Sequence, residues 1–213
     1  MAHVKEGTLL WKPNEAFQKK SNLFHYQQWL QQHKQLHFTD YHDLWQWSVN
    51  HLEAFWESIW EYTGMHSTTP YENVLSTHTM PGAEWFQGAM VNYTEHIFRE
   101  RDSQQTAIIH ASESRTITEV TWGKLYRDTA ALQHTLKQLG VKKGDRVVAY
   151  VPNIYEAVVA FLATASLGAI WSSASPDFGT QSVIDRFKQI EPKIMLTIDG
   201  YRYNGKPFDR QDI

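Results

Sequence analysis

The last part of the chain shows a regular alternation between short apolar runs and longer amphipathic segments. The apolar runs at residues 146–151, 169–173 and 193–198 are typical of buried strands. The segments between them, 153–167 and 180–190, have helical periodicity. Strands that are separated by single helices imply right-handed crossovers and a parallel sheet. The pattern therefore predicts an α/β fold.

The residues just before this alternation predict a β-hairpin followed by a helix. Residues 107–110 and 116–121 have the alternating pattern of two paired strands. Thr121 is a suitable N-cap for a helix that ends near Gly140. The leucines of this helix recur at helical spacing, and we expect four to face the core: Leu125, Leu132, Leu136 and Leu139.

The N-terminal part of the chain has a helical pattern instead. A short helix is predicted at residues 23–35. A stronger one begins after Thr39 and Asp40, either of which can supply the N-cap, and ends at Gly64. Apolar residues recur along it at spacings of 4, 3, 4 and 3, which predicts one buried face formed by Trp45, Val49, Leu52, Trp56 and Ile59.

The pattern divides the chain into two regions. Residues 65–91 lack periodicity and are predicted to form an extended loop, and residues 92–100 form a short helix. The character then changes at Thr106. We therefore expect a helical and extended, Trp-rich N-terminal region at 1–105 and the beginning of an α/β domain at 106–213.

The predicted sheet is too small to be complete. Three parallel strands cannot close a sheet, and an edge would stay bare. Residues 209–213 are typical of the opening of a further helix. We therefore expect an incomplete α/β lobe and a chain that is a fragment of a longer protein.

Composition narrows the classes of function. A formal net charge of -3 argues against a nucleic-acid partner and against an anionic membrane surface. The absence of cysteine excludes disulfides and thiolate metal sites. The longest apolar stretch, residues 157–170, is too short to span a bilayer, and residues 1–13 lack the apolar run of a secretory signal. We therefore expect a cytoplasmic protein.

Several familiar catalytic patterns are missing from the sequence. It has no Gly-x-Ser-x-Gly turn, no Gly-x-Gly-x-x-Gly motif and no complete P-loop. His33 and His37 are four residues apart, but no third ligand is near them, so solvent-facing histidines are expected and no metal site. Most of the 9 tryptophans precede residue 90, and their helical spacing favours a core over a stacking platform.

Two loops carry candidate binding chemistry. Residues 173–180 connect a strand to a helix at the carboxyl end of the sheet, so their backbone N–H groups could face a phosphate. An ordinary capped connection is the alternative. Residues 201–206 place Arg202 and Lys206 beside two tyrosine rings, which suits a phosphate and an adenine. A solvated charged loop explains the same residues.

Several segments resemble the acetoacetyl-CoA synthetases, within the adenylate-forming acyl-CoA synthetase superfamily. The N-terminal segments are Leu10-Trp11-Lys12-Pro13, Trp47-Ser48-Val49, Leu52-Glu53-x-Phe55-Trp56, Ile59-Trp60 and Met80-Pro81-Gly82-Ala83-x-Trp85-Phe86-x-Gly88-Ala89-x-x-Asn92-Tyr93. Later segments resemble the opening of the adenylate-forming domain: Thr121-Trp122-x-x-Leu125, Gly140-Val141-x-x-Gly144-Asp145-Arg146-Val147 and Pro152-Asn153-x-x-Glu156-Ala157.

The resemblance implies an ATP-dependent acid–thiol ligase acting on acetoacetate. The carboxylate would attack the α-phosphorus of ATP, with Mg²⁺, and the thiol of CoA would then displace AMP from the acyl-adenylate. A small C-terminal domain would rotate between the two steps. A synthetase for another short acid, such as acetate or propionate, and a non-catalytic binding module remain alternatives.

The resemblance also implies where the functional residues lie. The phosphate loop ending in Lys, the Mg²⁺-binding Glu and the catalytic Lys are expected after Ile213, so we expect no catalytic residue and no metal ligand in this chain, and the 213 residues alone to be inactive. Arg202 matches a CoA-contacting Arg of the family, and Lys206 is the nearest match to a second basic residue. The loop at Ser175 and Pro176 corresponds to a CoA-contacting turn of the family, although its residues differ from those of the family.

Overall fold

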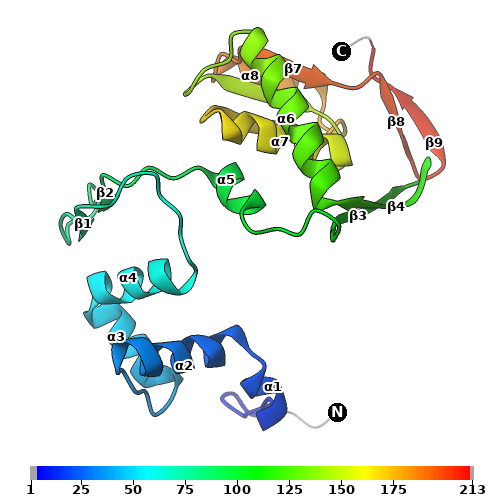
Figure 1. Cartoon of the computed structure of the whole chain (residues 1–213). Coiled ribbons are helices and arrows are strands. Elements are labelled where there is room, and N and C mark those ends of the chain that lie inside the picture. The colour runs from blue at the N-terminus through cyan, green and yellow to red at the C-terminus, as the bar shows by residue number, and fades with distance from the viewer. Residues whose placement is uncertain (1–3, 212–213) are drawn as a thin grey trace. The chain divides into compact units, whose positions relative to one another are not determined.

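A computed structural model describes residues 4–211, which divide after Met90 into two compact units (Figure 1). Four helices and a short antiparallel hairpin make up the described part of the first unit. Their bounds are α1 Glu15–Lys19, α2 Asn22–Lys34, α3 Tyr41–Asn50, α4 Leu52–Tyr62, β1 Asn73–Leu75 and β2 Trp85–Gln87.

The core of the first unit is built around a buried polar pair. Tyr26, Leu30 and Leu44 form its buried cluster. Ser58 is also buried, and its hydroxyl donates to the carbonyl of Phe55 at 2.6 Å. The hydroxyl of Tyr26 therefore donates to Ser58 Oγ, also at 2.6 Å. Because both polar groups have partners, the pair fixes α2 against α4 without leaving an unpaired group.

The prediction of one long helix ending at Gly64 is wrong, because the segment forms two helices. His51 has φ -129° and ψ 62°, outside the helical region, and ends α3 while preceding α4. A spacing of 4, 3, 4 and 3 cannot keep one face across such a bend. Leu44 is buried, whereas Trp45, Val49 and Trp56 of the predicted stripe are more than 40% exposed.

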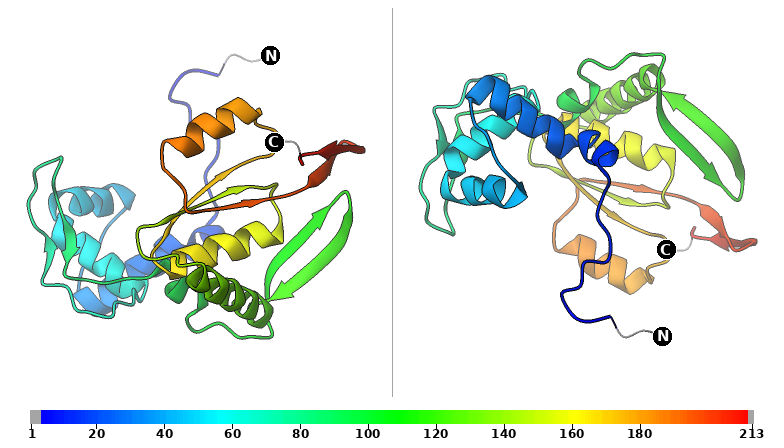
Figure 2. Two further views of the ribbon diagram at one scale, coloured as in Figure 1. Left: turned by 90° about the horizontal axis from the view of Figure 1, so that it is seen from above. Right: turned by 90° about the horizontal axis from the view of Figure 1, so that it is seen from below.

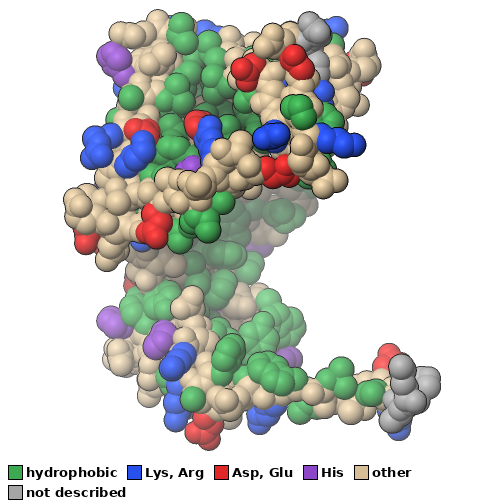
Figure 3. Space-filling view, turned by 90° about the vertical axis from the view of Figure 1, so that its right-hand side faces the viewer, with side chains coloured by type: hydrophobic (Ala, Val, Ile, Leu, Met, Phe, Trp, Pro, Cys, Tyr) green, Lys and Arg blue, Asp and Glu red, His purple; other side chains and the backbone are tan. Residues whose placement is uncertain are grey.

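The tryptophans of the first unit are less buried than their spacing predicts. Trp29 and Trp47 pack against the core cluster, but four others are exposed: Trp11, Trp45, Trp56 and Trp85. The space-filling view shows many hydrophobic side chains on the surface of this unit (Figure 3). The loop predicted at 65–91 is also not fully extended, since it contains the β1–β2 hairpin. Trp60 packs on Phe86 of that hairpin, with ring centroids 4.4 Å apart.

The second unit contains the α/β fold that the alternation predicts. Its elements are α5 Tyr93–Phe98, β3 Thr106–Ser112, β4 Arg115–Thr121, α6 Trp122–Gln138, β5 Arg146–Tyr150, α7 Tyr155–Ser166, β6 Ile170–Ala174, α8 Thr180–Lys188, β7 Ile194–Thr197, β8 Gly200–Tyr203 and β9 Lys206–Asp209. β5, β6 and β7 form a parallel sheet in the order β6-β5-β7. The pairs β3–β4 and β8–β9 are antiparallel hairpins.

Helices cover both faces of the parallel sheet. Val147 of β5 packs with Leu136 of α6 and Ala163 of α7 on one face. Val148 packs with Val183 and Phe187 of α8 on the other. Figure 2 shows α8 on one side of the sheet and α6 with α7 on the opposite side. β5 is buried on both faces, which explains its continuous apolar run.

Most boundaries predicted in this unit are confirmed, with three corrections. Leu125 and Leu136 are buried and Leu132 is partly buried, but Leu139 is 56% exposed because α6 has already ended. Residues 201–206, interpreted as a loop, form most of the β8–β9 hairpin. No helix begins at Asp209, which ends β9, and Gln211 lies in a turn; residues 212 and 213 lie outside the described part.

None of the helices within residues 4–211 has the length and apolar character needed to cross a membrane.

Candidate functional site

The sheet has a topological switch point between β5 and β6. The chain leaves β5 towards α7 on one face, and it leaves β6 towards α8 on the opposite face. The two connections therefore diverge and open a crevice at the carboxyl ends of these strands. In open α/β sheets, ligands bind at this place.

A cavity of about 360 Å³ occupies this crevice. Its polar wall comes from Asn153 after β5 and from Ser173 and Ser175 at the end of β6. The apolar wall is formed by α7 and β6 through Ala157, Val158, Phe161 and Trp171. Apolar walls with a few convergent polar groups are typical of a small-molecule site. Of the predicted site residues, Ser175 alone lines this cavity.

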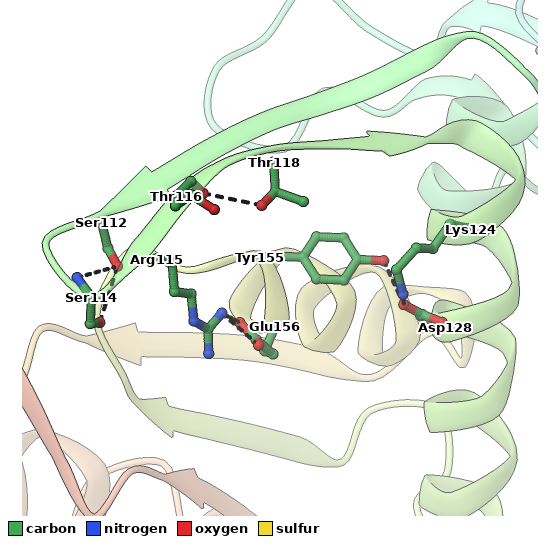
Figure 4. Close-up of polar contacts among 9 residues, drawn as sticks. All are labelled: Ser112, Ser114, Arg115, Thr116, Thr118, Lys124, Asp128, Tyr155 and Glu156. Atoms are coloured by element: carbon green, nitrogen blue, oxygen red, sulfur yellow. Dashed lines mark hydrogen bonds and ion pairs between the residues drawn. The ribbon is translucent and has the colours of Figure 1, made fainter.

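A second cavity, of about 370 Å³, lies beside it at the end of β7. Leu196, Thr197 and Ile198 form one side, and Arg115 and Glu156 are also part of its lining. Arg115 Nη1 donates to both carboxylate oxygens of Glu156, at 2.8 and 2.9 Å (Figure 4). This ion pair joins the β3–β4 hairpin to the start of α7 and leaves the rest of the lining largely apolar.

The loop between β6 and α8 is held by hydrogen bonds from within the protein. The buried hydroxyl of Tyr150 makes a bifurcated donation to the carbonyls of Pro176 and Phe178, each at 2.8 Å. Ser175 Oγ donates to Asp177 Oδ2 at 2.9 Å. Pro176 is itself fully buried, so it shapes the loop through its carbonyl and ring. Gly179 precedes α8 and supplies no side-chain cap to its N-terminus.

The β8–β9 hairpin is attached to this loop through Tyr201 and Arg210. Tyr201 Oη donates to Asp177 Oδ1 at 2.5 Å. Arg210 Nε donates to the carbonyl of Pro176 at 3.1 Å, and its guanidinium lies over the rings of Tyr201 and Phe208. The loop from β6 and the hairpin after β7 therefore form one polar cluster.

The hydrogen bonds of this cluster also shift the pKa values of Asp177 and Tyr201. Hydrogen bonds from Tyr201, and then from Ser175, lower the pKa of the Asp177 carboxyl. The bond to Asp177 raises the pKa of Tyr201. Near neutral pH, Asp177 is therefore ionised and Tyr201 is a neutral donor.

The two predicted basic residues lie on the same hairpin but on opposite faces. Arg202 pairs with Pro207, and Lys206 pairs with Tyr203 on the next rung. Side chains on successive rungs point to opposite sides of a β-ribbon. Both cations are exposed, and Lys206 shares the face of Tyr201 and Tyr203. The structure therefore brings Ser175 and Pro176 next to Tyr201, and it turns Arg202 away from them.

The tip of the hairpin is held by an acidic side chain. Asn204 and Gly205 both have positive φ, 50° and 73°, as a two-residue type I′ turn requires. Their backbone N–H groups donate to Glu113 Oε1 and Oε2 at 2.6 and 2.8 Å. A carboxylate from the β3–β4 turn thus fixes the end of the ribbon that carries Arg202 and Lys206.

Sequence reasoning missed Asp177, Arg210 and Glu113. Asn204-Gly205 is the strongest short hairpin signal and would have revealed the ribbon. With the hairpin known, strand alternation separates Arg202 from Tyr201. The contacts of Asp177 and Arg210 span loops, and no local pattern predicts them.

In the part of the chain that the structure describes, the histidines and acidic residues do not gather into a metal site. His33 and His37 are both exposed, as predicted, and His33 Nδ1 contacts the carbonyl of Trp29 at 3.0 Å. Within residues 4–211, no group of three or more His, Asp or Glu side chains could hold a metal ion.

An open α/β lobe with helices on both faces and a cavity at its switch point belongs to the class of nucleotide- and small-molecule-binding α/β folds. Residues 96–212 match the family described as AMP-binding enzyme, and residues 41–97 match the acetyl-coenzyme A synthetase N-terminus. Because the first match covers more than half of the chain, the chain belongs to the AMP-binding enzyme family.

Similar proteins are named after one activity. The chain is 38% identical to an acetoacetyl-CoA synthetase from Danio rerio, over 98% of this chain and 31% of the relative. It is also 38% identical to one from Rhizobium meliloti, over 96% and 31%. The structure of an acetoacetyl-CoA synthetase from Streptomyces lividans matches with a TM-score of 0.91 and 43% identity, over 95% of this chain and 32% of that one. The chain thus spans about a third of these relatives.

Proposed function

We propose that the chain is the N-terminal part of an ATP-dependent acetoacetate–CoA ligase. The observation that carries the proposal is the similarity over 95% of the chain to the Streptomyces lividans enzyme, which includes both units and reaches a TM-score of 0.91. Relatives from a fish and a bacterium carry the same activity in their names. The segments Trp47-Ser48-Val49 and Met80-Pro81-Gly82-Ala83, which resemble the acetoacetyl-CoA synthetases, support acetoacetate as the acid.

The proposed reaction has two steps. The carboxylate of acetoacetate attacks the α-phosphorus of ATP and releases pyrophosphate, and the sulfur of CoA then attacks the acyl carbon and releases AMP. Both steps depend on charge stabilisation and positioning. The phosphate loop, the Mg²⁺ ligand and the catalytic Lys are proposed to come from the rest of a chain about three times as long. The 213 residues alone are then inactive.

The proposed contribution of this chain is part of the CoA nucleotide site. Arg202 and Lys206 are exposed cations on opposite faces of a short, braced ribbon, so each is suited to a different phosphate group. Ser175 offers a hydroxyl at the edge of the crevice cavity. Pro176 acts through the loop that it shapes, because its ring is buried.

Composition supports a proposal for the partners and the compartment of the protein. The partners are a small acid and the remainder of the same polypeptide, without nucleic acid or membrane. The cytoplasm is the proposed compartment, because a 213-residue stretch without cysteine fits reducing surroundings.

The main competitor is a ligase for acetate or propionate, and it has its own support. Residues 41–97 match the N-terminus of acetyl-coenzyme A synthetase. A panel of acids separates the two proposals: acid-dependent ATP–pyrophosphate exchange is measured with the full-length protein and acetoacetate, acetate, propionate or butyrate. We expect kcat/KM to be highest for acetoacetate, by about tenfold or more. A higher value for acetate or propionate would replace acetoacetate in the proposal.

A further inference from the structure

We infer that Tyr201, Asp177 and Arg210 are positioning residues that hold the β8–β9 hairpin so that Arg202 faces its ligand. The inference rests on the proposed CoA nucleotide site and extends it to residues that do not themselves contact the nucleotide. The juxtaposition that carries it is the attachment of the hairpin to the β6–α8 loop, between residues 24 to 34 positions apart.

Tyr201 provides the first attachment. Its hydroxyl donates to Asp177 Oδ1 at 2.5 Å, while Ser175 Oγ donates to the other carboxylate oxygen at 2.9 Å. Its ring stacks on that of Phe208 across the ribbon, with centroids 5.2 Å apart and planes within 15°. The loop and the two strands of the hairpin are therefore connected through one side chain.

Arg210 provides the second attachment. Its Nε donates to the carbonyl of Pro176 at 3.1 Å and its Nη2 to Tyr201 Oη at 3.3 Å. The guanidinium lies 5.3 Å from the ring centroid of Tyr201 and 5.8 Å from that of Phe208. Because it is planar, it can stack and donate hydrogen bonds at once, which a lysine ammonium could not do.

The loop that receives these contacts is also held by a hydrogen bond from the sheet. The carbonyl of Pro176 accepts from Arg210 on one side and from the buried Tyr150 hydroxyl, at 2.8 Å, on the other. Tyr150 belongs to the central strand of the sheet. The hairpin is therefore anchored, through Pro176, to the most buried strand of the fold.

Strand alternation converts this attachment into an orientation for Arg202. Tyr201 points to the loop, so its neighbour Arg202 points to the other side of the ribbon. Among residues 4–211, the Arg202 guanidinium makes no hydrogen bond or ion pair. The attachment of the hairpin to the loop thus holds the unpaired Arg202 guanidinium in one orientation. If the attachment is lost, the ribbon can twist, and the guanidinium no longer keeps that orientation.

The test uses single and double variants of the full-length protein. Tyr201→Phe removes the hydroxyl that Asp177 accepts from but keeps the ring stack, and Asp177→Ala removes the acceptor. We expect each to raise KM for CoA by about fivefold, with kcat and acetoacetate-dependent ATP–pyrophosphate exchange unchanged. The double variant should resemble either single one, because all three lose the same bond.

Two further variants complete the design. Asp177→Asn retains a carbonyl oxygen that can accept from Tyr201, and it should restore part of the loss in affinity for CoA. Tyr126→Phe removes the hydroxyl of an exposed tyrosine on α6 and should leave KM for CoA unchanged.

The outcomes separate this inference from the proposed function. An unchanged KM for CoA in Tyr201→Phe and Asp177→Ala, or additive effects in the double variant, would overturn the positioning role. An equal loss of exchange activity would also overturn it, since the attachment would then be a general brace. If the wild-type protein shows no acetoacetate-dependent exchange, the proposed function itself has failed, whatever the variants do.

Discussion

The hydroxyl of Tyr155 donates a hydrogen bond of 2.8 Å to Asp128 Oδ2, the carboxylate oxygen that also pairs with Lys124 (Figure 4). The bond joins the first turn of α7 to the middle of α6. Burial, and then the bond to Asp128, raise the pKa of Tyr155 far above its ordinary value of 10.0. The Lys124 ammonium, followed by Tyr155, lowers the pKa of Asp128 below 3.8.

These two shifts predict a window of stability at moderate pH. A raised tyrosine pKa contributes stability that is present below pH 10.0 and is lost as the pH rises above it. A lowered aspartate pKa contributes stability that is present above pH 3.8 and is lost as the pH falls below it. Tyr155→Phe should lower the free energy of unfolding by about 1 kcal/mol at neutral pH. The variant should also lose less stability than the wild type as the pH rises above 10.0. Tm measured between about pH 7 and 11 checks this, and an equally steep alkaline fall in the variant would contradict it.

Asn92 joins two helix ends, and its variants can separate the two roles. Its Oδ1 accepts from the backbone N–H groups of Thr94 and Glu95 as the N-cap of α5. Its Nδ2 donates to the carbonyls of Ala165 and Ser166 at the end of α7. Asn92→Ala loses both sets and should cost about 2 kcal/mol.

The matched variants of Asn92 differ in charge and in donors. Asn92→Ser keeps a cap and loses the donors, so it should cost less than Asn92→Ala. Asn92→Asp also keeps the cap but places a carboxylate against helix C-terminal carbonyls, so it should be less stable than Asn92→Ser. Urea unfolding gives the order. An Asp variant as stable as the wild type would show that the amide donors contribute nothing.

Gly200 is required for the close approach of the two strands of the hairpin. A Cβ at this position would lie 2.6 Å from the carbonyl oxygen of Phe208, a backbone atom that cannot move aside alone. Gly200→Ala should therefore displace β9 and raise KM for CoA in the full-length protein. Gly179 has negative φ, and a methyl group added there would meet no atom within 4 Å, so Gly179→Ala is the control. Equal effects of the two substitutions would refute the steric argument.

Arg202 is expected to act in one half-reaction only. In the full-length protein, Arg202→Ala should raise KM for CoA about tenfold through loss of a charge-assisted phosphate contact, with ATP–pyrophosphate exchange within about twofold of wild type. Lys206→Ala should act in the same direction. Lys137→Ala removes an exposed cation from α6 and serves as the control. Equal loss of both half-reactions in Arg202→Ala would make Arg202 a structural residue.

Sequence patterns predict the second unit well because its signals are local. β5 is buried on both faces, so its apolar run is unambiguous, and Thr121 caps α6 as predicted through its bond to the N–H of Lys124. In the first unit, the helix prediction is wrong at His51. The backbone of this one residue lies outside the helical region, so α4 does not continue the face of α3. The predicted domain boundary between residues 105 and 106 stays a prediction.

The sequence indicates candidate site residues only through family resemblance, and their role stays a prediction. Arg202 is indicated by a direct match to the family, whereas Lys206, Ser175 and Pro176 are indicated only by their place near family positions. The attachment of Tyr201 to Asp177 could not be predicted, since it joins residues 24 positions apart through a loop that has no periodicity. Physical contacts of this kind depend on how the loops after β6 and β7 meet.

The most direct test of the proposed ligase activity is product analysis with the full-length protein, ATP, Mg²⁺, CoA and acetoacetate. Chromatography of the reaction should show acetoacetyl-CoA, AMP and pyrophosphate in equal amounts, and their formation should require every substrate. Formation of ADP and phosphate in place of AMP and pyrophosphate, or no thioester from acetoacetate, would contradict the proposed activity.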